Sequence, residues 1–274
     1  MASHLHIRQR GHLDTDLLAS VHLVRIGLGR DVGQLEMLAS TGIGRFTLID
    51  PGFVEPENVG QSGYTWADVG KRKVDAAHDH IAAFNPAAVV TTIKAKHHEV
   101  SDLDHLFADA DLVTDGVDDL AVAADLAKIA CAAAADVLHI RTTGNSRQFV
   151  ITGTLRRFGV PGCARCRLKG AFDAIERGYT PPDHFPSFRL VPERLNVHAA
   201  WVTLGLLHHR QDSSLPIADV GARFLAHPAW VGLNGIDPAS GEIFPIHPYR
   251  EPIASDWTCP VCGTEADALG PAMS

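Results

Sequence analysis

Residues 21–50 read VHLVRIGLGRDVGQLEMLASTGIGRFTLID. The first nine residues form an apolar run that ends in glycines, which predicts a buried strand entering a phosphate loop. Residues 31–44 carry apolar side chains at helical spacing and end in glycines, and residues 45–50 predict a second strand with Asp50 at its end. Strand, glycine turn, helix, strand and acid follow in the order of a nucleotide- or dinucleotide-binding unit.

The glycine turn and the acid at the end of the second strand are the first candidate ligand contacts. Gly27 and Gly29 allow a ligand to approach the backbone, and Asp50 is placed to accept hydrogen bonds from ribose hydroxyls. The helix after the turn offers unpaired N–H groups to phosphate. Arg30 and Asp31, however, replace the close-approach glycines of a normal G-x-G-x-x-G turn, so a turn without a ligand stays an alternative.

Alternating strand and helix patterns continue through the N-terminal half. Further strands are predicted at 88–95, 111–119 and 136–144, with helices at 71–85 and 120–135. The alternation predicts an α/β fold with a Rossmann-like, mostly parallel sheet and helices on both faces. Ligands of such sheets bind beyond the carboxyl ends of the strands, where Asp50, Asp115 and Asp118 are expected.

The composition limits the kinds of partner. A chain of 274 residues can bury a full core, and we expect a nucleotide-binding α/β domain at 1–160 with a C-terminal extension, 161–274, that completes the same globule. The net charge of -8 supplies no basic field for nucleic acid. No apolar run is long enough to span a bilayer, and the N-terminus lacks a signal-peptide pattern, so we expect a cytoplasmic protein without a membrane partner.

Four of the five cysteines form two C-x-x-C pairs, in GCARCRLKG at 162–170 and TCPVCGT at 258–264. Four soft thiolates suit a tetrahedral structural zinc ion, which is closed by four protein ligands. We therefore expect zinc to tie the C-terminal segment to the middle of the chain, with the ligands Cys163, Cys166, Cys259 and Cys262. A thioredoxin-like dithiol is the alternative, although it needs only one pair.

The stretch LIDPGFVEPENVGQSGYTWADVGKRKVDAAHDHIAAFNP at 48–86 adds a further pattern. It resembles the ThiF/MoeB adenylyltransferases, relatives of the ubiquitin-activating enzymes, which show V-E-x-x-N-x-x-R-Q, then D-x-G-x-x-K at a helix start, then N-P. The residues that match in register are Val54, Glu55, Asn58, Asp68, Gly70, Lys73, Asn85 and Pro86. DLVTDGVDD at 111–119 resembles the family's D-L-V-x-D-x-x-D-N, and the paired cysteines match its structural zinc site.

The resemblance implies ATP-dependent adenylation of a carboxylate, with Mg²⁺ as a second cofactor and zinc in a structural role. The substrate would be the C-terminus of a ubiquitin-like carrier protein or peptide, or a small biosynthetic acid. By resemblance, Asp50 binds ribose, Lys73 binds phosphate and Asn58 helps to position the phosphates. Asp118 holds Mg²⁺, and Asp115 belongs to the cofactor-binding group. A thioester relay is not expected, because no cysteine lies between the two pairs.

Three positions depart from the family pattern. Gln61 and Ser62 replace its arginine and glutamine, and Asp119 replaces its last asparagine. Glutamine can donate hydrogen bonds but carries no charge, so Arg30 is a candidate either to supply the missing charge near the triphosphate or to block the pocket. Two alternatives stay open: a non-catalytic member of the fold that binds a peptide or partner, and, with less support, a nicotinamide-dinucleotide-binding protein.

The segments after residue 170 resemble the family in plan only. RLNVHAAWVTLGLLHHR at 194–210 predicts a mostly apolar helix. Because family members form homodimers, this helix is a candidate for part of that interface. YTPPDHFPSF at 179–188 is a proline-rich loop that we interpret as a candidate lid.

Overall fold

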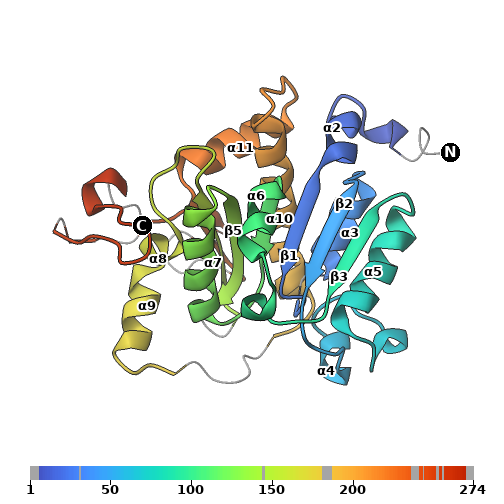
Figure 1. Ribbon diagram of the computed structural model, residues 1–274, viewed down its shortest axis with the longest axis horizontal. Coiled ribbons are helices and arrows are strands. Elements are labelled where there is room, and N and C mark those ends of the chain that lie inside the picture. Colours follow the sequence, from blue (N-terminus) through green and yellow to red (C-terminus); the bar gives the residue numbers. More distant parts are fainter. Residues whose placement is uncertain are drawn as a thin grey trace.

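The computed structural model describes residues 6–30, 32–143, 146–180, 187–235, 241–242, 244–250, 253–254 and 256–269. One eight-stranded sheet runs through them in the order β3-β2-β1-β4-β5-β6-β7-β8 (Figure 1). Its strands are β1 His22–Ile26, β2 Arg45–Ile49, β3 Val89–Ile93, β4 Leu112–Asp115, β5 Asp136–Thr143, β6 Gln148–Leu155, β7 Ala229–Leu233 and β8 Ile246–Pro248. The first five pair in parallel and the last three join antiparallel, which confirms the Rossmann-like sheet.

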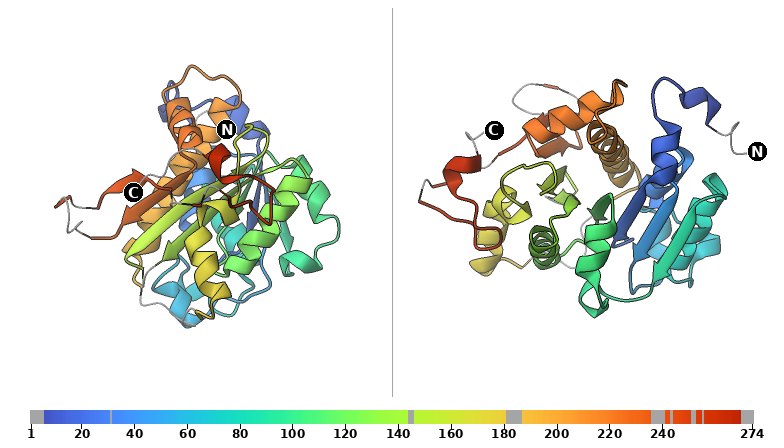
Figure 2. Two further views of the ribbon diagram at one scale, coloured as in Figure 1. Left: turned by 90° about the vertical axis from the view of Figure 1, so that its left-hand side faces the viewer. Right: turned by 45° about the horizontal axis from the view of Figure 1, so that its top comes forward.

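Helices cover both faces of this sheet, as predicted (Figures 1 and 2). The α-helices are α2 Thr15–Ser20, α3 Val32–Ser40, α4 Pro56–Val59, α5 Lys73–Phe84, α6 Leu103–Asp109, α7 Leu120–Ala132, α8 Ala164–Arg167, α9 Lys169–Glu176, α10 Leu190–His209 and α11 Ile217–Ala226. The 3-10 helices are η1 Ile7–Gln9, η2 Trp66–Asp68, η3 His97–Glu99 and η4 Ala266–Leu269. α3, α5 and α10 share one apolar core, and α6 and α7 share a second one. None of the described helices is long and apolar enough to cross a membrane.

The parallel strands lie close to their predicted positions, because a strand buried on both faces is a continuous apolar run. All five residues of β1 are buried, although two of them, His22 and Arg25, are polar. α10 begins at Leu190, earlier than the predicted start at 194. Pro192 falls in its first turn, where the missing N–H has no helical partner to lose.

The C-terminal half extends the same sheet with elements that the sequence patterns did not predict. β6 returns antiparallel along β5, from the pair Asp136–Leu155 to the pair Thr143–Gln148. β7 and β8 add the far edge, and α11 packs along α10. Residues 181–186 of the predicted lid lie outside the described residues.

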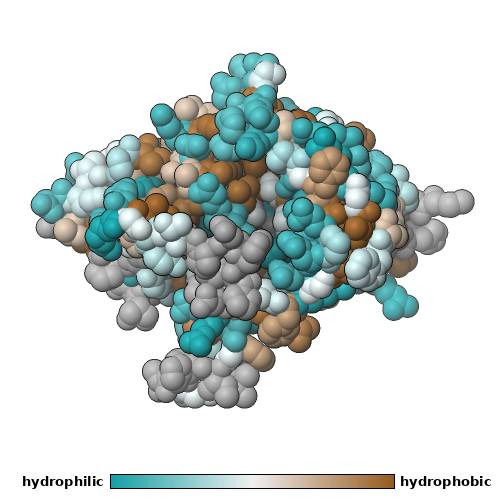
Figure 3. Space-filling view, turned by 90° about the horizontal axis from the view of Figure 1, so that it is seen from below, coloured by the Kyte–Doolittle hydropathy of each residue, from teal (hydrophilic) through white to brown (hydrophobic). Residues whose placement is uncertain are grey.

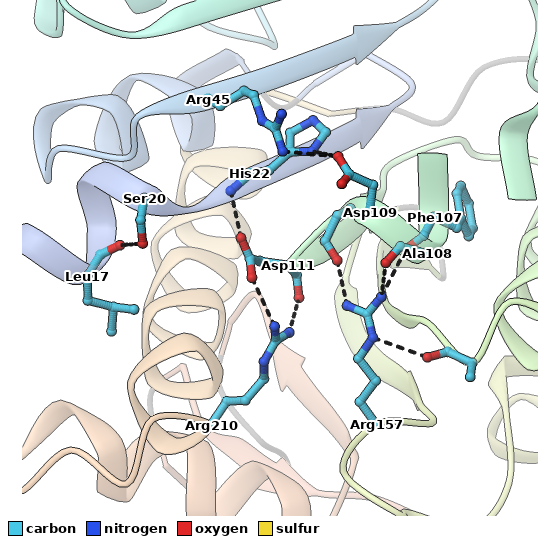
Figure 4. Close-up of polar contacts among 12 residues, drawn as sticks. Leu17, Ser20, His22, Arg45, Phe107, Ala108, Asp109, Asp111, Arg157 and Arg210 are labelled. Carbon is cyan, nitrogen blue, oxygen red and sulfur yellow. Dashed lines mark hydrogen bonds and ion pairs between the residues drawn. The ribbon is translucent and has the colours of Figure 1, made fainter. Parts of the chain in front are cut away.

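The amino ends of the parallel strands are tied together by charged side chains (Figure 4). Asp111, just before β4, accepts a hydrogen bond from His22 N in β1 and is held by Arg210 after α10. Arg157 donates to three carbonyls at the end of α6, where the helix leaves acceptors unpaired. This edge is opposite the carboxyl ends of the strands, where ligands of such sheets bind, so these charges lie away from the candidate site.

Candidate functional site

The carboxyl ends of the parallel strands lie beside α4 at the bottom of Figure 1, and Figure 3 looks onto this side of the molecule. There Gly27 follows β1 with a φ of +80°, and its amide donates to Ile49 O at 2.9 Å. A Cβ on Gly27 would lie 2.6 Å from Val117 Cγ2 and 2.9 Å from Val117 N, so only glycine fits. A Cβ on Gly29 would meet nothing within 4 Å, so the turn is open on that side.

Asp50 joins the glycine turn to the loop after β2. Its two carboxylate oxygens accept hydrogen bonds from Leu28 N and Gly52 N, each at 2.7 Å. Lys73, the first residue of α5, donates its backbone amide to Gly52 O at 3.0 Å, so Lys73 lies beside the same loop. Among the described residues, Lys73 Nζ has no hydrogen-bond or ion-pair partner. The glycine turn, Asp50 and an unpaired ammonium group thus share one edge of the sheet.

Asn58 and Gln61 lie on the segment that follows this loop. The side-chain oxygen of Asn58 accepts a hydrogen bond from Glu55 N at 2.9 Å and so caps α4. Its carbonyl accepts from Gln61 N at 3.2 Å, which leaves Gln61 half-buried directly after the helix. Asn58 therefore has a local structural task, while its side-chain N–H groups have no partner within the described part of the chain.

Arg30 reaches across the turn to the loop after β4. Its guanidinium contacts the Asp118 carboxylate and Thr142 Oγ1 near the end of β5. The Asp118 side chain is otherwise open to solvent and 66% exposed. The structure thus brings together two residues that lie far apart in the chain, and it pairs the carboxylate expected to hold Mg²⁺ with a cation of the protein itself. Asp31 lies outside the described residues.

Asp115 ends β4 and is fully buried beneath this surface. It accepts hydrogen bonds from Val117 N at 2.9 Å and His139 Nδ1 at 2.8 Å, and it pairs with Arg141. Burial alone would raise the pKa of Asp115, but the charge of Arg141 and the hydrogen bond from His139 outweigh it and hold the pKa below its usual range. In this structure the carboxylate holds neighbouring side chains in place beneath the site.

Two arginines buried within strands of the sheet, Arg25 in β1 and Arg141 in β5, were not predicted. Arg25, the fourth of the five residues of β1, donates to Gly27 O at 2.9 Å and to Gln34 Oε1 at 3.2 Å. Burial lowers the pKa of Arg25 to about 10, so it stays charged at neutral pH. The charges of Asp115 and Arg141 both act on Arg25, so the buried group beneath the glycine turn holds two guanidinium groups and one carboxylate. The available signal was a basic residue within each of two apolar strand patterns, HLVRI and VLHIRTT.

His80 on α5 connects α3 to the segment that carries Asp68. Its Nδ1 faces Glu36 Oε1, and its Nε2 faces Asp68 Oδ2 at 2.9 Å. Ionised carboxylates only accept hydrogen bonds, so both ring nitrogens carry protons in this arrangement. The hydrogen bond to Glu36 raises the pKa of His80, and the bond to Asp68 adds to this rise against the opposing effect of burial.

We expect the His80 contacts to make the stability depend on pH. Because the folded-state pKa is raised, the contribution of His80 is complete below its unfolded value of about 6.5 and is lost as the pH rises through the folded-state pKa. Denaturant unfolding across this range should show the loss in the wild type and not in His80→Gln. His78→Gln, on the exposed side of α5, should keep the wild-type trend. An unchanged trend in His80→Gln would contradict the assignment.

The two C-x-x-C pairs converge, which confirms that the C-terminal segment meets the middle of the chain. Cys163 Sγ lies 3.9 Å from Cys166 Sγ and 3.7 Å from Cys259 Sγ. Cys166 Sγ lies 3.5 Å from Cys262 Sγ. Four sulfurs bound tetrahedrally to zinc at about 2.3 Å would be about 3.8 Å apart, so the cluster could hold this ion. Cys131 on α7 packs nearby but is not one of the four.

A mostly parallel sheet with a glycine turn after its first strand, an acid after its second and a four-cysteine cluster defines a class of α/β protein built like the nucleotide-binding folds. The sequence pattern of the ThiF family matches residues 2–190. The chain therefore belongs to the ThiF family.

Two curated relatives of the chain are molybdopterin-synthase adenylyltransferases. The chain is 34% identical to the one from Escherichia coli (strain K12) over 164 residues, which are 57% of this chain and 62% of the relative. It is 30% identical to the one from Salmonella typhimurium over 109 residues, which are 39% of this chain and 43% of the relative. The chain thus spans less than two thirds of the length of either relative.

Solved structures share the fold at lower identity. E. coli MccB in complex with ATP has a TM-score of 0.63 and 20% identity, covering 91% of this chain and 68% of MccB. PaaA has a TM-score of 0.61 and 18% identity, covering 85% of this chain and 74% of PaaA. At this identity the similarity concerns the fold alone.

Proposed function

We propose that the chain is an ATP-dependent adenylyltransferase that activates a carboxylate, with Mg²⁺ as cofactor and zinc as a structural ion. The observation that carries the proposal is that the Lys73 ammonium group has no partner among the described residues. The backbone amide of Lys73 binds the loop that Asp50 holds. An unpaired ammonium group at the carboxyl edge of a parallel sheet suits a phosphate. The relatives named molybdopterin-synthase adenylyltransferase support the same activity.

In the proposed reaction an oxygen of the carboxylate attacks the α-phosphorus of ATP, an acyl-adenylate forms and pyrophosphate leaves. Lys73 and Arg30 neutralise charge on the phosphates, to which Asn58 and Gln61 donate hydrogen bonds. Asp50 positions the ribose, since each of its oxygens keeps a lone pair after accepting one backbone N–H. Asp118 would hold Mg²⁺ once its ion pair with Arg30 opens, and the ion would supply further charge neutralisation.

The proposed substrate is the C-terminus of a ubiquitin-like carrier protein or of a peptide, or a small biosynthetic acid. MccB, which shares the fold, has been solved with ATP and with MccA. Residues 167–258 contain no cysteine, so the adenylate passes to an external nucleophile rather than to a thiol of this segment. The proposed setting is the cytoplasm, where reduced cysteines can hold zinc.

ATP–pyrophosphate exchange tests the proposal. The protein is supplied with ATP, Mg²⁺ and a panel of carrier C-termini, peptides and small acids, and we expect exchange that depends on one of these classes. A specific observation favours a second candidate, a non-catalytic protein that binds a peptide or partner: the Arg30–Asp118 ion pair fills the expected metal position, and Gln61 lacks the family's charge. Peptide binding without exchange and without ATP binding would support that candidate.

Gln61→Arg is expected to retain exchange activity and to raise it by up to about tenfold, because a charge-assisted hydrogen bond to phosphate is roughly twice as strong as a neutral one. Gln61→Glu is the matched control, since it has the same shape and should lower activity by repelling the phosphates. The readout is the exchange rate at saturating carboxylate. An arginine variant that is folded but inactive would contradict the placement of Gln61 beside the triphosphate.

A homodimer completes the proposal. α10 leaves three apolar side chains exposed, Leu190, Val197 and Trp201, at spacings that place them on one helix face. We expect Trp201→Glu to shift the protein toward a monomer, measured by light scattering during gel filtration. Val89→Glu, on the exposed edge strand β3, is the control and should leave the dimer intact. A Trp201→Glu variant that stays fully dimeric would exclude this face.

A further inference from the structure

His139 in β5 is a fully buried histidine that the proposed reaction does not use. Its Nδ1 lies 2.8 Å from Asp115 Oδ2, and its Nε2 lies 3.1 Å from Thr154 Oγ1 in β6. The pKa of Asp115 is held below its usual range, so its carboxylate only accepts hydrogen bonds and His139 Nδ1 carries the proton. Burial lowers the pKa of His139, so Nε2 is unprotonated and accepts the hydrogen of the Thr154 hydroxyl.

Thr154 fixes the ring from the side opposite Asp115. Its Oγ1 also accepts a hydrogen bond at 3.1 Å from the amide of Ala164, the first residue of α8. The hydrogen bonds therefore run in one direction, from this amide through the hydroxyl and the ring to the carboxylate. Because a rotated ring would leave buried groups at both ends without a partner, His139 has one orientation.

Asp115 holds the loop after β4. Its second oxygen, Oδ1, accepts a hydrogen bond from Val117 N at 2.9 Å. A Cβ on Gly27 would lie 2.6 Å from Val117 Cγ2, so the loop packs directly against the glycine turn. The next residue is Asp118, the proposed Mg²⁺ ligand. This loop therefore lines the candidate nucleotide site, and a buried carboxylate sets its position.

We propose that His139 is a positioning residue, which holds the loop after β4 in its binding arrangement through Asp115 and is itself held by Thr154. The inference rests on the proposed function where it names ATP as the ligand. Both ring nitrogens are already paired within the protein, so His139 acts without touching the ligand. Without the Nδ1 donor the Asp115 carboxylate is less firmly oriented, so the loop samples other arrangements and the affinity for nucleotide falls.

Two amide substitutions separate the contact with Asp115 from the contact with Thr154. In His139→Asn the side-chain amide is bonded to Cγ, as Nδ1 is in histidine, so a donor to Asp115 is retained. In His139→Gln the amide lies at the position of Nε2, so the contact with Thr154 is retained and the donor to Asp115 is lost. Each variant buries one amide group at the same place, so a purely structural effect would be similar in both. Thr154→Val is a third variant, which keeps the shape and removes the hydroxyl.

The first readout is hydrogen exchange of the Val117 amide in the ligand-free protein, because this N–H donates to Asp115. We expect exchange about tenfold faster in His139→Gln, and close to the wild-type rate in His139→Asn. The second readout is titration calorimetry with ATP and Mg²⁺ and with inorganic pyrophosphate. If the loop holds its binding arrangement about a tenth to a fifth of the time, His139→Gln binds both ligands about five- to tenfold more weakly. Thr154→Val should change both readouts in the same direction by less.

His208→Gln is the matched control, because His208 is also fully buried but lies near the end of α10. Its Nδ1 donates to Leu204 O at 2.8 Å, and its Nε2 accepts from Asp14 N at 2.9 Å, ahead of β1. These contacts lie on the amino-terminal side of the sheet. The control should therefore lower the unfolding temperature and leave the Val117 amide and both affinities as in the wild type.

The outcomes separate this inference from the proposed function. Weaker ligand binding in His139→Gln than in His139→Asn, without carboxylate-dependent ATP–pyrophosphate exchange in the wild type, would support the inference and overturn the proposed function. Wild-type ATP–pyrophosphate exchange, together with equal affinities in these two variants, would overturn the inference alone. Wild-type values of both readouts in Thr154→Val would also overturn it, which decides the matter should His139→Gln fail to fold. A wild-type protein that binds neither ligand would contradict both.

Discussion

Cys259→Ser is expected to lower the free energy of unfolding by about 4–5 kcal/mol, the size of the loop-closure term for a cross-link around about 100 residues. In the proposed site, zinc closes a loop between Cys163 and Cys259, which are 96 positions apart in the chain. A serine hydroxyl is a poor substitute for a zinc-bound thiolate, so the C-terminal segment loses its attachment to the middle of the chain. The measurement is urea unfolding together with the zinc content of the purified protein.

Cys131→Ser is the matched control, because Cys131 packs beside the cluster but lies outside the four sulfurs. It should keep one zinc ion per chain and close to wild-type stability. Chelation of zinc from the wild type should reproduce the effect of Cys259→Ser, since metal binding and folding are coupled in sites of this kind. Metal-free protein that is as stable as protein with zinc would contradict a structural role for zinc in the four-cysteine cluster.

Lys73→Ala is expected to lower the rate of ATP–pyrophosphate exchange by about a hundred- to a thousandfold, comparable to the loss of a single oxyanion-stabilising donor in other enzymes. Lys73 begins α5, and its backbone amide binds the loop that Asp50 holds. Its ammonium group has no competing partner among the described residues. Exchange kinetics and ATP affinity by calorimetry are the two readouts. Because the ammonium group binds the phosphates of ATP in the proposed site, we expect both the exchange rate and the affinity to fall.

Lys71→Ala is the control for Lys73→Ala, because its ammonium group is already paired with Asp68 and Asp79. It should retain most of the exchange activity. Arg30→Ala should weaken ATP binding if its guanidinium replaces the charge that Gln61 lacks. Wild-type ATP affinity and exchange in both Lys73→Ala and Arg30→Ala would show that the proposed site is wrong and that the family relationship describes only the fold.

The parallel half of the fold could be predicted because local patterns specify it. Residues 21–50 combine apolar runs, helical spacing and glycine stops, each with a direct structural meaning. The cysteine cluster could be predicted from chemistry, since four thiolates in two pairs suit one tetrahedral zinc ion. β7 and β8 offered no such signal: β8 has three residues, and the pairing of short antiparallel strands depends on tertiary context.

The candidate site could be predicted only in part. Asp50 and Lys73 have fixed places in a sequence pattern, and the structure puts both at the loop after β2. The contact of Arg30 with Asp118 joins segments that are far apart in the chain. Helical spacing and charge patterns describe each element alone, so they do not indicate which charged side chains will meet after folding.

Transfer of a heavy oxygen isotope from carboxylate to AMP tests the central claim most directly. A carrier or peptide C-terminus labelled at both carboxylate oxygens is incubated with the protein, ATP and Mg²⁺, and hydroxylamine is added to cleave the acyl-adenylate. Attack of the carboxylate on the α-phosphorus leaves one labelled oxygen as the bridge, and cleavage at the acyl carbon releases it with AMP. We predict AMP that carries one heavy oxygen, and AMP formed without label, or ADP as the only nucleotide product, would contradict the account.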